Sequence, residues 1–255
     1  MEVIAVANQK GGCGKTTSCV NLSAYLAVKG KKVLLIDLDP QGSSSAHLGI
    51  GVRESLENTM YEVMMKGLSI TNLIRTTEIP GLDIAPTSNR LGRAELELAS
   101  KPIARESVLK SKISQLSNYD FIVIDTPPTL GYLTLNALVA CNTVLIPIQT
   151  EYFAIQGLSM ILELVNMITD DLGHHMKIRY LLTMYDARTK LSKEVSRQVR
   201  EQLGDSVFNT VIPQNIKLAE APSYKKAIHL SAPDSPGAIA YDKLADEVIE
   251  CQDQK

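Results

Sequence analysis

Short apolar runs alternate with longer amphipathic segments along the whole chain. Runs such as residues 33–36 carry no polar position at all, which is typical of parallel strands buried on both faces. The predicted strands are residues 3–7, 33–36, 82–85, 121–124, 144–148, 178–184 and 211–212. The predicted helices are residues 19–28, 56–65, 91–98, 103–116, 130–139, 155–168, 191–203 and 235–249.

The order of these elements predicts the fold class. Strands that alternate with helices require right-handed crossovers and give one mostly parallel sheet with helices on both faces. No internal repeat, low-complexity segment or linker interrupts the pattern. We therefore expect a single α/β domain over residues 1–255, built as three layers, α/β/α.

Composition narrows the class of protein further. Of 255 residues, 45% are apolar and 21% charged, which is ordinary for a globular chain, and no apolar run reaches membrane-spanning length. The four cysteines have no Cys-x-x-Cys spacing, which argues against a zinc site or a disulfide framework and favours a reducing cytoplasm. The net charge of −2 means that any contact with nucleic acid depends on a local basic patch.

One segment carries the clearest chemistry. It reads Lys10-Gly11-Gly12-Cys13-Gly14-Lys15-Thr16-Thr17 and lies between the first strand and the first helix. Strand, Gly-rich turn and helix in that order is the context of a phosphate-binding loop, in which backbone N–H groups face the phosphates. We therefore expect the three-layer domain to have the P-loop NTPase fold. Lys15 would reach the β- and γ-phosphates, and the Thr16 hydroxyl would bind Mg²⁺. The usual first glycine is replaced by Gln9, and Lys10 is an additional lysine at the entrance.

Three aspartates follow other predicted strands. Asp37 and Asp39 come after residues 33–36, and Asp125 ends the strand at 121–124. Because the carboxyl ends of parallel strands share one edge of the sheet, we expect these carboxylates beside the phosphate loop. Asp125 is the expected Mg²⁺ ligand, direct or through a water. Asp39 is expected to orient the attacking water, and Asp37 to support it or join the metal shell.

Taken together, these motifs resemble the ParA/Soj partition ATPases of the deviant-Walker-A group that also contains MinD. The matching segments are Lys10–Thr17, Asp37–Gly42, Asp125–Pro128 and residues 151–158, 183–189, 212–215 and 220–223. They extend over nearly the whole chain.

This resemblance implies an ATP- and Mg²⁺-dependent switch that hydrolyses ATP as a sandwich homodimer. Lys10 would cross to the partner's phosphates, Lys15 and Asp39 would complete the catalytic set, and Pro213 and Asn215 would flank adenine. Thr16, Asp39 and Asp125 would form the metal shell, and the loop from Lys10 to Thr17 would hold the nucleotide. Cys13 stands where the family commonly has valine.

The resemblance also implies a DNA partner. Residues 188–226 contain eight basic and four acidic side chains, a local excess of four positive charges, and Arg188 and Lys217 match family positions that contact DNA. We expect nonspecific, salt-dependent binding of double-stranded DNA, release after hydrolysis stimulated by a ParB-like centromere-binding protein, and a nucleoid-associated location.

Two other functions stay open at this stage. A membrane-positioning ATPase of the MinD type requires a basic amphipathic C-terminal helix, but residues 245–255 are acidic. An electron-transfer relative of the nitrogenase iron protein requires cysteines that bridge a cluster, and Cys141 has no suitable companion. The cargo, whether chromosome, plasmid or protein assembly, is not encoded in any motif.

Overall fold

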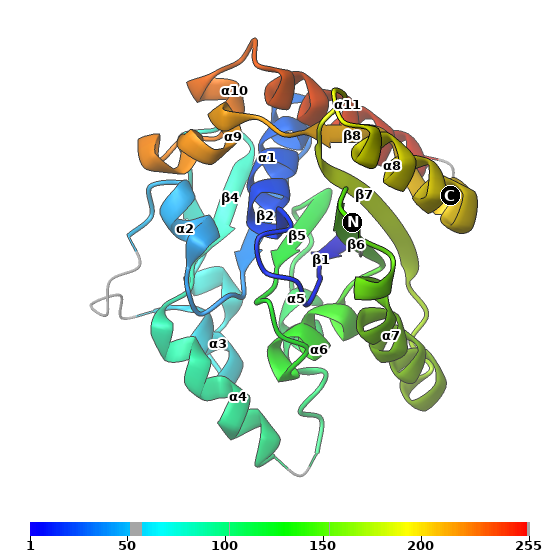
Figure 1. Ribbon diagram of the computed structural model, residues 1–255. Helices are drawn as coiled ribbons and strands as arrows, with labels where there is room; N and C mark the ends of the chain where they lie inside the picture. The colour runs from blue at the N-terminus through cyan, green and yellow to red at the C-terminus, as the bar shows by residue number, and fades with distance from the viewer. Residues whose placement is uncertain (52–57, 102, 153, 254–255) are drawn as a thin grey trace.

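The computed structural model describes residues 1–51, 58–101, 103–152 and 154–253. Within them an eight-stranded sheet has the order β3-β4-β2-β5-β1-β6-β7-β8 (Figure 1). The strands are β1 (Glu2–Val6), β2 (Val33–Asp37), β3 (Arg75–Thr76), β4 (Leu82–Ala85), β5 (Phe121–Asp125), β6 (Thr143–Gln149), β7 (Lys177–Tyr185) and β8 (Val207–Pro213). All neighbouring strands pair in parallel except β3 and β4.

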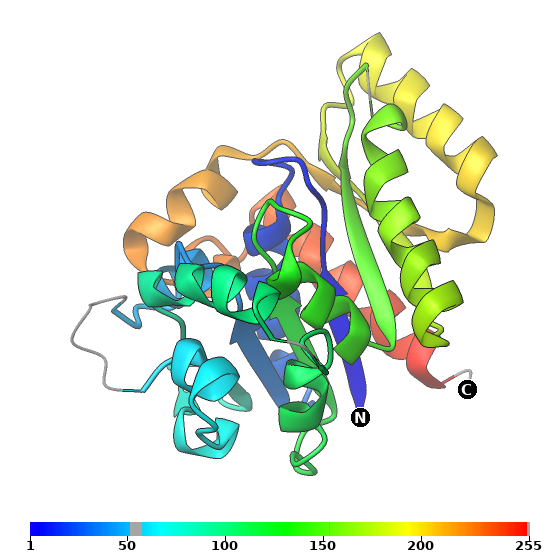
Figure 2. The same ribbon diagram turned by 90° about the horizontal axis from the view of Figure 1, so that it is seen from below.

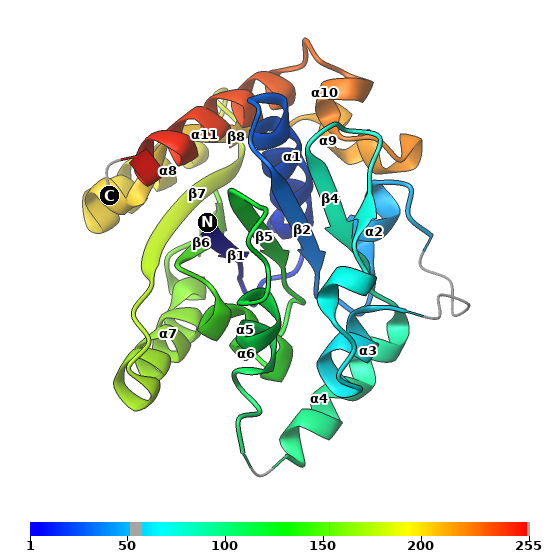
Figure 3. The same cartoon turned by 180° about the vertical axis from the view of Figure 1, so that it is seen from behind.

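Helices cover both faces of this sheet and bury two separate apolar cores (Figures 1 and 3). The longer helices are α1 (Lys15–Val28), α4 (Gly92–Ala99), α6 (Tyr132–Ala140), α7 (Ser159–Leu172), α8 (Lys190–Leu203) and α11 (Pro236–Asp253). The shorter ones are α2 (Ser43–His47), α3 (Met60–Met65), α5 (Val108–Ile113), α9 (Ile216–Glu220) and α10 (Ile228–Ser231). One core packs under α1, α10 and α11, and the other under α3 to α8. The predicted three-layer fold is confirmed.

The strand predictions need two corrections. The pattern missed β3, whose two residues are both exposed and carry no apolar signal. It also predicted only residues 211–212 for β8, which begins at Val207. The polar pair Asn209 and Thr210 interrupts the apolar run there, at an irregularity in the pairing of β7 with β8. Part of the predicted helix 56–65, including Leu56, lies outside the described residues; α3 begins at Met60.

The helix predicted over residues 103–116 is much shorter in the structure. Ala104 has a φ of 55°, in the left-handed region, which a right-handed helix cannot contain. The helix therefore begins only after Ser107, as α5, and ends at Ile113. The other long helices were predicted correctly apart from shifts of a few residues at their ends.

The central strands place the functional segments together. Asp37 pairs with Asp125 in the register of β2 and β5, and Val6 pairs with Asp125 in the register of β1 and β5. The loop from Gln9 to Gly14 leaves β1 at this edge and leads into α1 (Figure 1). The expected convergence of the aspartates on the phosphate loop is thus a consequence of strand order.

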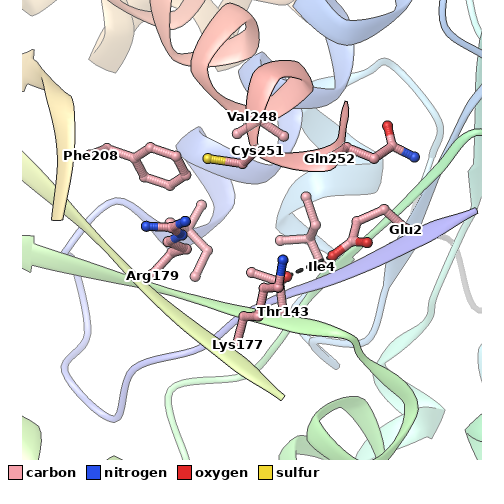
Figure 4. Close-up of a pocket in the computed structure, with 10 residues that line it drawn as sticks. Glu2, Ile4, Thr143, Lys177, Arg179, Phe208, Val248, Cys251 and Gln252 are labelled. Carbon is pink, nitrogen blue, oxygen red and sulfur yellow. Dashed lines mark hydrogen bonds between the residues drawn. The ribbon is translucent and has the colours of Figure 1, made fainter. Parts of the chain in front are cut away.

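The opposite edge of the sheet contains a small cavity (Figure 4). The start of β1 and the end of α11, which both contribute to its lining, lie on the same side of the molecule (Figure 2). The cavity is lined by Glu2, Arg179, Phe208 and Cys251 among others, and Thr143 donates a 2.6 Å hydrogen bond to Glu2. Its volume of about 30 Å³ gives room for a water or two. This cavity is too small for a substrate and lies away from the phosphate loop.

No helix within the described ranges is long and apolar enough to cross a membrane.

The outer edge of β8 is closed by a side chain from α11. Glu247 accepts hydrogen bonds from the backbone N–H groups of Asn209 and Thr210, both at 2.7 Å. Arg200 of α8 donates to the carbonyl of Asn209 at 3.0 Å. An edge strand with free N–H groups can pair with a strand of another chain, so these hydrogen bonds also protect the sheet from association.

We expect Glu247→Ala to lower the free energy of unfolding by about 1–2 kcal/mol, because two N–H groups lose a charged acceptor in a partly solvated position. Urea denaturation followed by circular dichroism measures the change. Glu250→Ala, at an exposed position on the same helix, is the matched control. Equal stability of the two variants would show that the hydrogen bonds of Glu247 contribute nothing to the free energy of unfolding.

Candidate nucleotide-binding site

The phosphate loop has the backbone shape that its glycines permit. Gly12 and Gly14 have φ values of 73° and 92°, which side chains rarely adopt. A Cβ atom built on Gly11 or Gly12 would meet nothing within 4 Å, so the loop borders open space. Helix α1 begins directly after Gly14, without a side-chain cap and without an acidic residue in its first turn. Its N-terminal N–H groups are therefore available to an anion.

Both loop lysines have partners within the chain. Lys15 is buried and donates a 2.9 Å hydrogen bond from Nζ to the carbonyl of Lys10. Lys10 extends the other way, and its ammonium forms an ion pair with Glu151, which follows β6. Glu151 belongs to a motif that matched the family, but its contact with Lys10 was not foreseen, because the two residues are 141 positions apart. The interface role predicted for Lys10 stays a prediction.

Cys13 is a packing residue in this loop. Its side chain is fully buried, its thiol lies 3.2 Å from the Lys10 carbonyl, and burial raises its pKa. A buried thiol with a raised pKa is a poor nucleophile, so the side chain acts as a small filler. Thr183, at the end of β7, donates a 2.9 Å hydrogen bond to the Cys13 carbonyl and holds the loop backbone in place.

The aspartates that end β2 and β5 are both fully buried. Asp37 accepts hydrogen bonds from the amide and hydroxyl of Ser45, at 2.8 and 2.6 Å. Ser44 donates to Asp125 Oδ2 at 2.7 Å. Burial raises the pKa of both carboxyl groups; the neighbouring Asp125 adds to the shift of Asp37, and the hydroxyls of Ser44 and Thr16 counter that of Asp125.

One oxygen in this cluster has no hydrogen-bond partner. Asp125 Oδ1 is buried and unbonded among the atoms that the structure describes, although Thr16 lies beside the same carboxylate. A buried carboxylate oxygen without a partner is costly unless a cation or water completes it. In nucleotide sites Mg²⁺ binds such a carboxylate oxygen and a nearby hydroxyl, and phosphates and waters supply the other ligands. The residues present therefore fit Mg²⁺.

Asp39 lies in a hydrogen-bonded turn and is only 8% exposed. Its Oδ1 accepts from the amide of Gln41 at 2.9 Å, and its carbonyl accepts from Gly42 at 2.8 Å. The loop is thus folded back on the aspartate itself, through Oδ1. The Asp39 amide donates to Asp37 Oδ1 at 3.3 Å, which keeps the two aspartates side by side.

A pocket of about 290 Å³ lies next to the phosphate loop. Pro213 and Asn215 line it together with Gly14, Thr17 and Tyr241, where the sequence predicted the adenine to lie. Met184, which also lines this pocket, has a φ of 52°, a strained value for a residue with a side chain and one that often marks a functional site. The pocket and the loop together have room for a base and a phosphate chain.

The two predicted DNA contacts both lie beyond the carboxyl ends of adjacent strands. Arg188 follows β7 and is 88% exposed in its side chain, where it forms a bidentate pair with Asp186. Lys217, on α9 after β8, pairs with Glu220 at 3.0 Å. The Lys217–Glu220 pair is exposed on both sides and contributes little to stability. Within the described chain Lys190, Lys193, Lys225 and Lys226 form no ion pair, so the predicted basic segment keeps unpaired charge.

Sequence comparison identifies the family that carries this site. A family described as an AAA domain matches residues 1–178. The sporulation initiation inhibitor protein Soj of Bacillus subtilis is 45% identical over 249 residues, which cover 97% of this chain and 98% of that protein. The chain belongs to the ParA/Soj family of partition ATPases. The chromosome-partitioning ATPase Soj of Treponema pallidum is 44% identical over 100% of this chain and 99% of its own.

Solved structures share the fold of this chain. A crystal structure described as cobyrinic acid a,c-diamide synthase from Mycobacterium smegmatis, with a bound ATP analog and magnesium, is 33% identical. It covers 98% of this chain and 94% of its own, with a TM-score of 0.85. The cell division ATPase MinD of Pyrococcus furiosus is 24% identical, with a TM-score of 0.78 over 98% of this chain and 99% of its own, and shares the fold.

Short helix α2 links this site to the turn before α10. Its first residues, Ser44 and Ser45, bond Asp125 and Asp37. At its other end His47 is 2% exposed and lies 3.2 Å from the carbonyl of Lys226 through Nε2. An isolated histidine carries no spacing signal, so no role for His47 can be predicted from the sequence. Burial lowers the pKa of His47 from its ordinary 6.5 to about 4, against the raising effect of the Lys226 carbonyl.

This histidine predicts a pH dependence of stability. The folded chain binds a proton less readily than the unfolded chain, so the contribution of neutral His47 is complete above pH 6.5 and is lost as the pH falls toward 4. The full loss is about 3 kcal/mol. Thermal melts between pH 7.5 and 5 should fall more steeply for the native chain than for His47→Gln, whose amide can still reach the carbonyl. His175→Gln, at an exposed position, should change nothing; equal slopes for His47→Gln and the native chain would contradict the assignment.

Proposed function

We propose that this chain is an ATP-hydrolysing switch for DNA segregation that binds DNA nonspecifically as an ATP-bound homodimer. The observation that carries the proposal is the phosphate loop, with Lys10 at its entrance, placed against the Asp37, Asp39 and Asp125 cluster. Membership of a family of partition ATPases, and the ATP analog and magnesium bound by a solved structure of similar fold, support it.

The loop residues and the buried carboxylates have different roles in phosphoryl transfer. Residues Gly11 to Thr17 hold the phosphates, while Pro213 and Asn215 hold the base. Lys15 leaves the Lys10 carbonyl and neutralises the β- and γ-phosphates. Thr16, Asp39 and Asp125 would hold Mg²⁺. When bound, Mg²⁺ neutralises charge on the transferring phosphoryl group.

Lys10 makes the reaction depend on a second subunit. In the described chain its ammonium is held by Glu151 of the same chain. Closure of two chains around ATP exchanges this carboxylate for the partner's phosphates, so that each Lys10 stabilises charge in the opposite site as an arginine finger does. Asp39, already held by its turn, orients the water that attacks the γ-phosphate.

The DNA-bound state follows from the same closure. Arg188 and Lys217 carry exposed charges at the carboxyl edge of the sheet, and a dimer doubles them. Contacts of this kind bind the phosphate backbone without reading sequence and weaken with salt. A ParB-like centromere-binding protein stimulates hydrolysis, and the chain leaves the nucleoid as its subunits separate.

ATP turnover in the presence and absence of partners tests the proposal. We expect slow turnover by the chain alone and faster turnover when nonspecific duplex DNA and a ParB-like protein are both present. Turnover that is identical under all conditions would contradict a partner-controlled switch, and a chain that hydrolyses no ATP would contradict the enzyme itself.

A further inference from the structure

The N-terminus of α6, the first helix after the Asp125 loop, is capped by a side chain from another helix. Glu95 on α4 accepts hydrogen bonds from the amides of Tyr132 and Leu133, at 2.7 and 3.1 Å. The residue at the cap position itself is Gly131, which has no side chain to offer. A carboxylate at a helix N-terminus satisfies free N–H groups and interacts favourably with the helix dipole.

Gly131 makes room for this carboxylate. Its φ is −85°, so the backbone does not require glycine. A Cβ atom at this position would instead lie 2.6 and 2.7 Å from the two carboxylate oxygens of Glu95. The two residues therefore fit each other, and a side chain at position 131 would expel the carboxylate.

The cap fixes one end of the loop that carries Asp125. The other end is fixed by the Asp125 carbonyl, which accepts from Leu38 at 2.9 Å, and by the Thr126 hydroxyl, which donates to the Val6 carbonyl at 2.9 Å. Only the short stretch 127–130 spans the distance between these anchors. Within this stretch the Thr134 hydroxyl of α6 also donates to the Thr129 carbonyl at 2.5 Å, so the loop moves with the start of α6, which Glu95 holds.

Helix α4 also lies beside the loop that carries Asp39. The ring of Pro40 lies 3.8 Å from the position a Cβ would take on Gly92, in the first turn of α4. One helix therefore lies beside the Asp39 loop at its start and holds the exit of the Asp125 loop through Glu95. Catalysis requires the relative positions of the groups on these two loops to be accurate to a fraction of an ångström.

We propose that Glu95 is a positioning residue for ATP hydrolysis, which sets the Asp125 loop relative to the Asp39 loop by capping α6. This role rests on the proposed function, since it needs an ATPase reaction to act upon. Glu95 lies on another helix and acts through the backbone of α6, so its removal should affect the rate of the chemical step more than the binding of ATP.

The first experiment compares Glu95→Ala with the native full-length chain. Steady-state ATP turnover gives kcat and KM, and titration of a fluorescent ATP analog gives the dissociation constant. We expect kcat to fall roughly tenfold or more, with the dissociation constant changed less than about twofold. Glu97→Ala is the matched control, because Glu97 accepts from the Tyr61 hydroxyl at 2.8 Å and does not touch α6. It should keep the native kcat.

A second variant separates positioning from folding. Gly131→Ala should lower kcat as Glu95→Ala does, and adding it to Glu95→Ala should cause no further loss, because the carboxylate it would expel is already gone. Glu95→Gln, which keeps one acceptor oxygen, should lie between the native chain and Glu95→Ala, and provides the comparison if the alanine variant does not fold. Native kcat in Glu95→Ala or Glu95→Gln, or losses that multiply in the double variant, would overturn the proposal. A native chain without ATP turnover would instead contradict the proposed function.

Discussion

Replacing Lys10 with alanine should lower ATP turnover roughly 10³-fold, the contribution that a charged finger makes to phosphoryl transfer. The ammonium of Lys10 forms an ion pair with Glu151 and points away from Lys15, which would bind the phosphates of the same chain. Binding of ATP by a single chain should therefore change little, while the steep dependence of turnover on protein concentration should disappear. Turnover measured across a protein dilution series, together with the nucleotide dissociation constant, gives both quantities.

Lys32→Ala is the control for this variant. Lys32 is exposed and precedes β2 at the opposite edge of the sheet, so its loss removes a positive charge without touching the site. A Lys10→Ala chain that keeps native turnover and its dependence on concentration would show that no second subunit takes part through this residue.

Asp39→Ala should retain ATP and accumulate as a dimer, because no carboxylate remains to orient the attacking water. Loss of such a group costs on the order of 10²–10⁴-fold in rate. The phosphate loop, Lys15 and Asp125 are unchanged, so binding and closure persist. Light scattering of the ATP-bound chain, with the bound nucleotide identified by chromatography, measures both effects.

The turn at Asp39 requires a second variant. Oδ1 of Asp39 accepts from the Gln41 amide, and alanine removes that bond together with the carboxylate. Asp39→Asn keeps an acceptor for the turn and removes only the charge, so it should behave as Asp39→Ala does. If both variants hydrolyse ATP at the native rate, the water-orienting role of this carboxylate is wrong.

The sequence predicted the layers of the fold and the convergence of the strand ends well, because both depend on local patterns. Buried runs such as residues 33–36 identify parallel strands, and polar residues at their ends converge whenever the strands are neighbours. Asp37, Asp125 and the phosphate loop met as predicted for this reason. The elements that were missed have no such pattern: β3 is two exposed residues, and the left-handed Ala104 looks like a helix former in a sequence.

The long-range contacts around the site were not predictable in the same way. Glu151 meets Lys10, Glu95 meets the start of α6, and Thr183 meets Cys13, and each pair is far apart in the chain. A lone carboxylate or hydroxyl within a helix or strand carries no spacing that reveals its partner. These contacts depend on how whole elements pack, which only the three-dimensional structure contains.

The central claim is that ATP, rather than ADP, creates the DNA-binding form. Fluorescence anisotropy of a labelled nonspecific duplex, titrated with the native chain at low salt, tests it most directly. With ATP and magnesium we expect binding that weakens steeply as salt rises, and with ADP we expect little binding at the same protein concentrations. Equal binding with ATP and ADP, or none with ATP, would contradict the account.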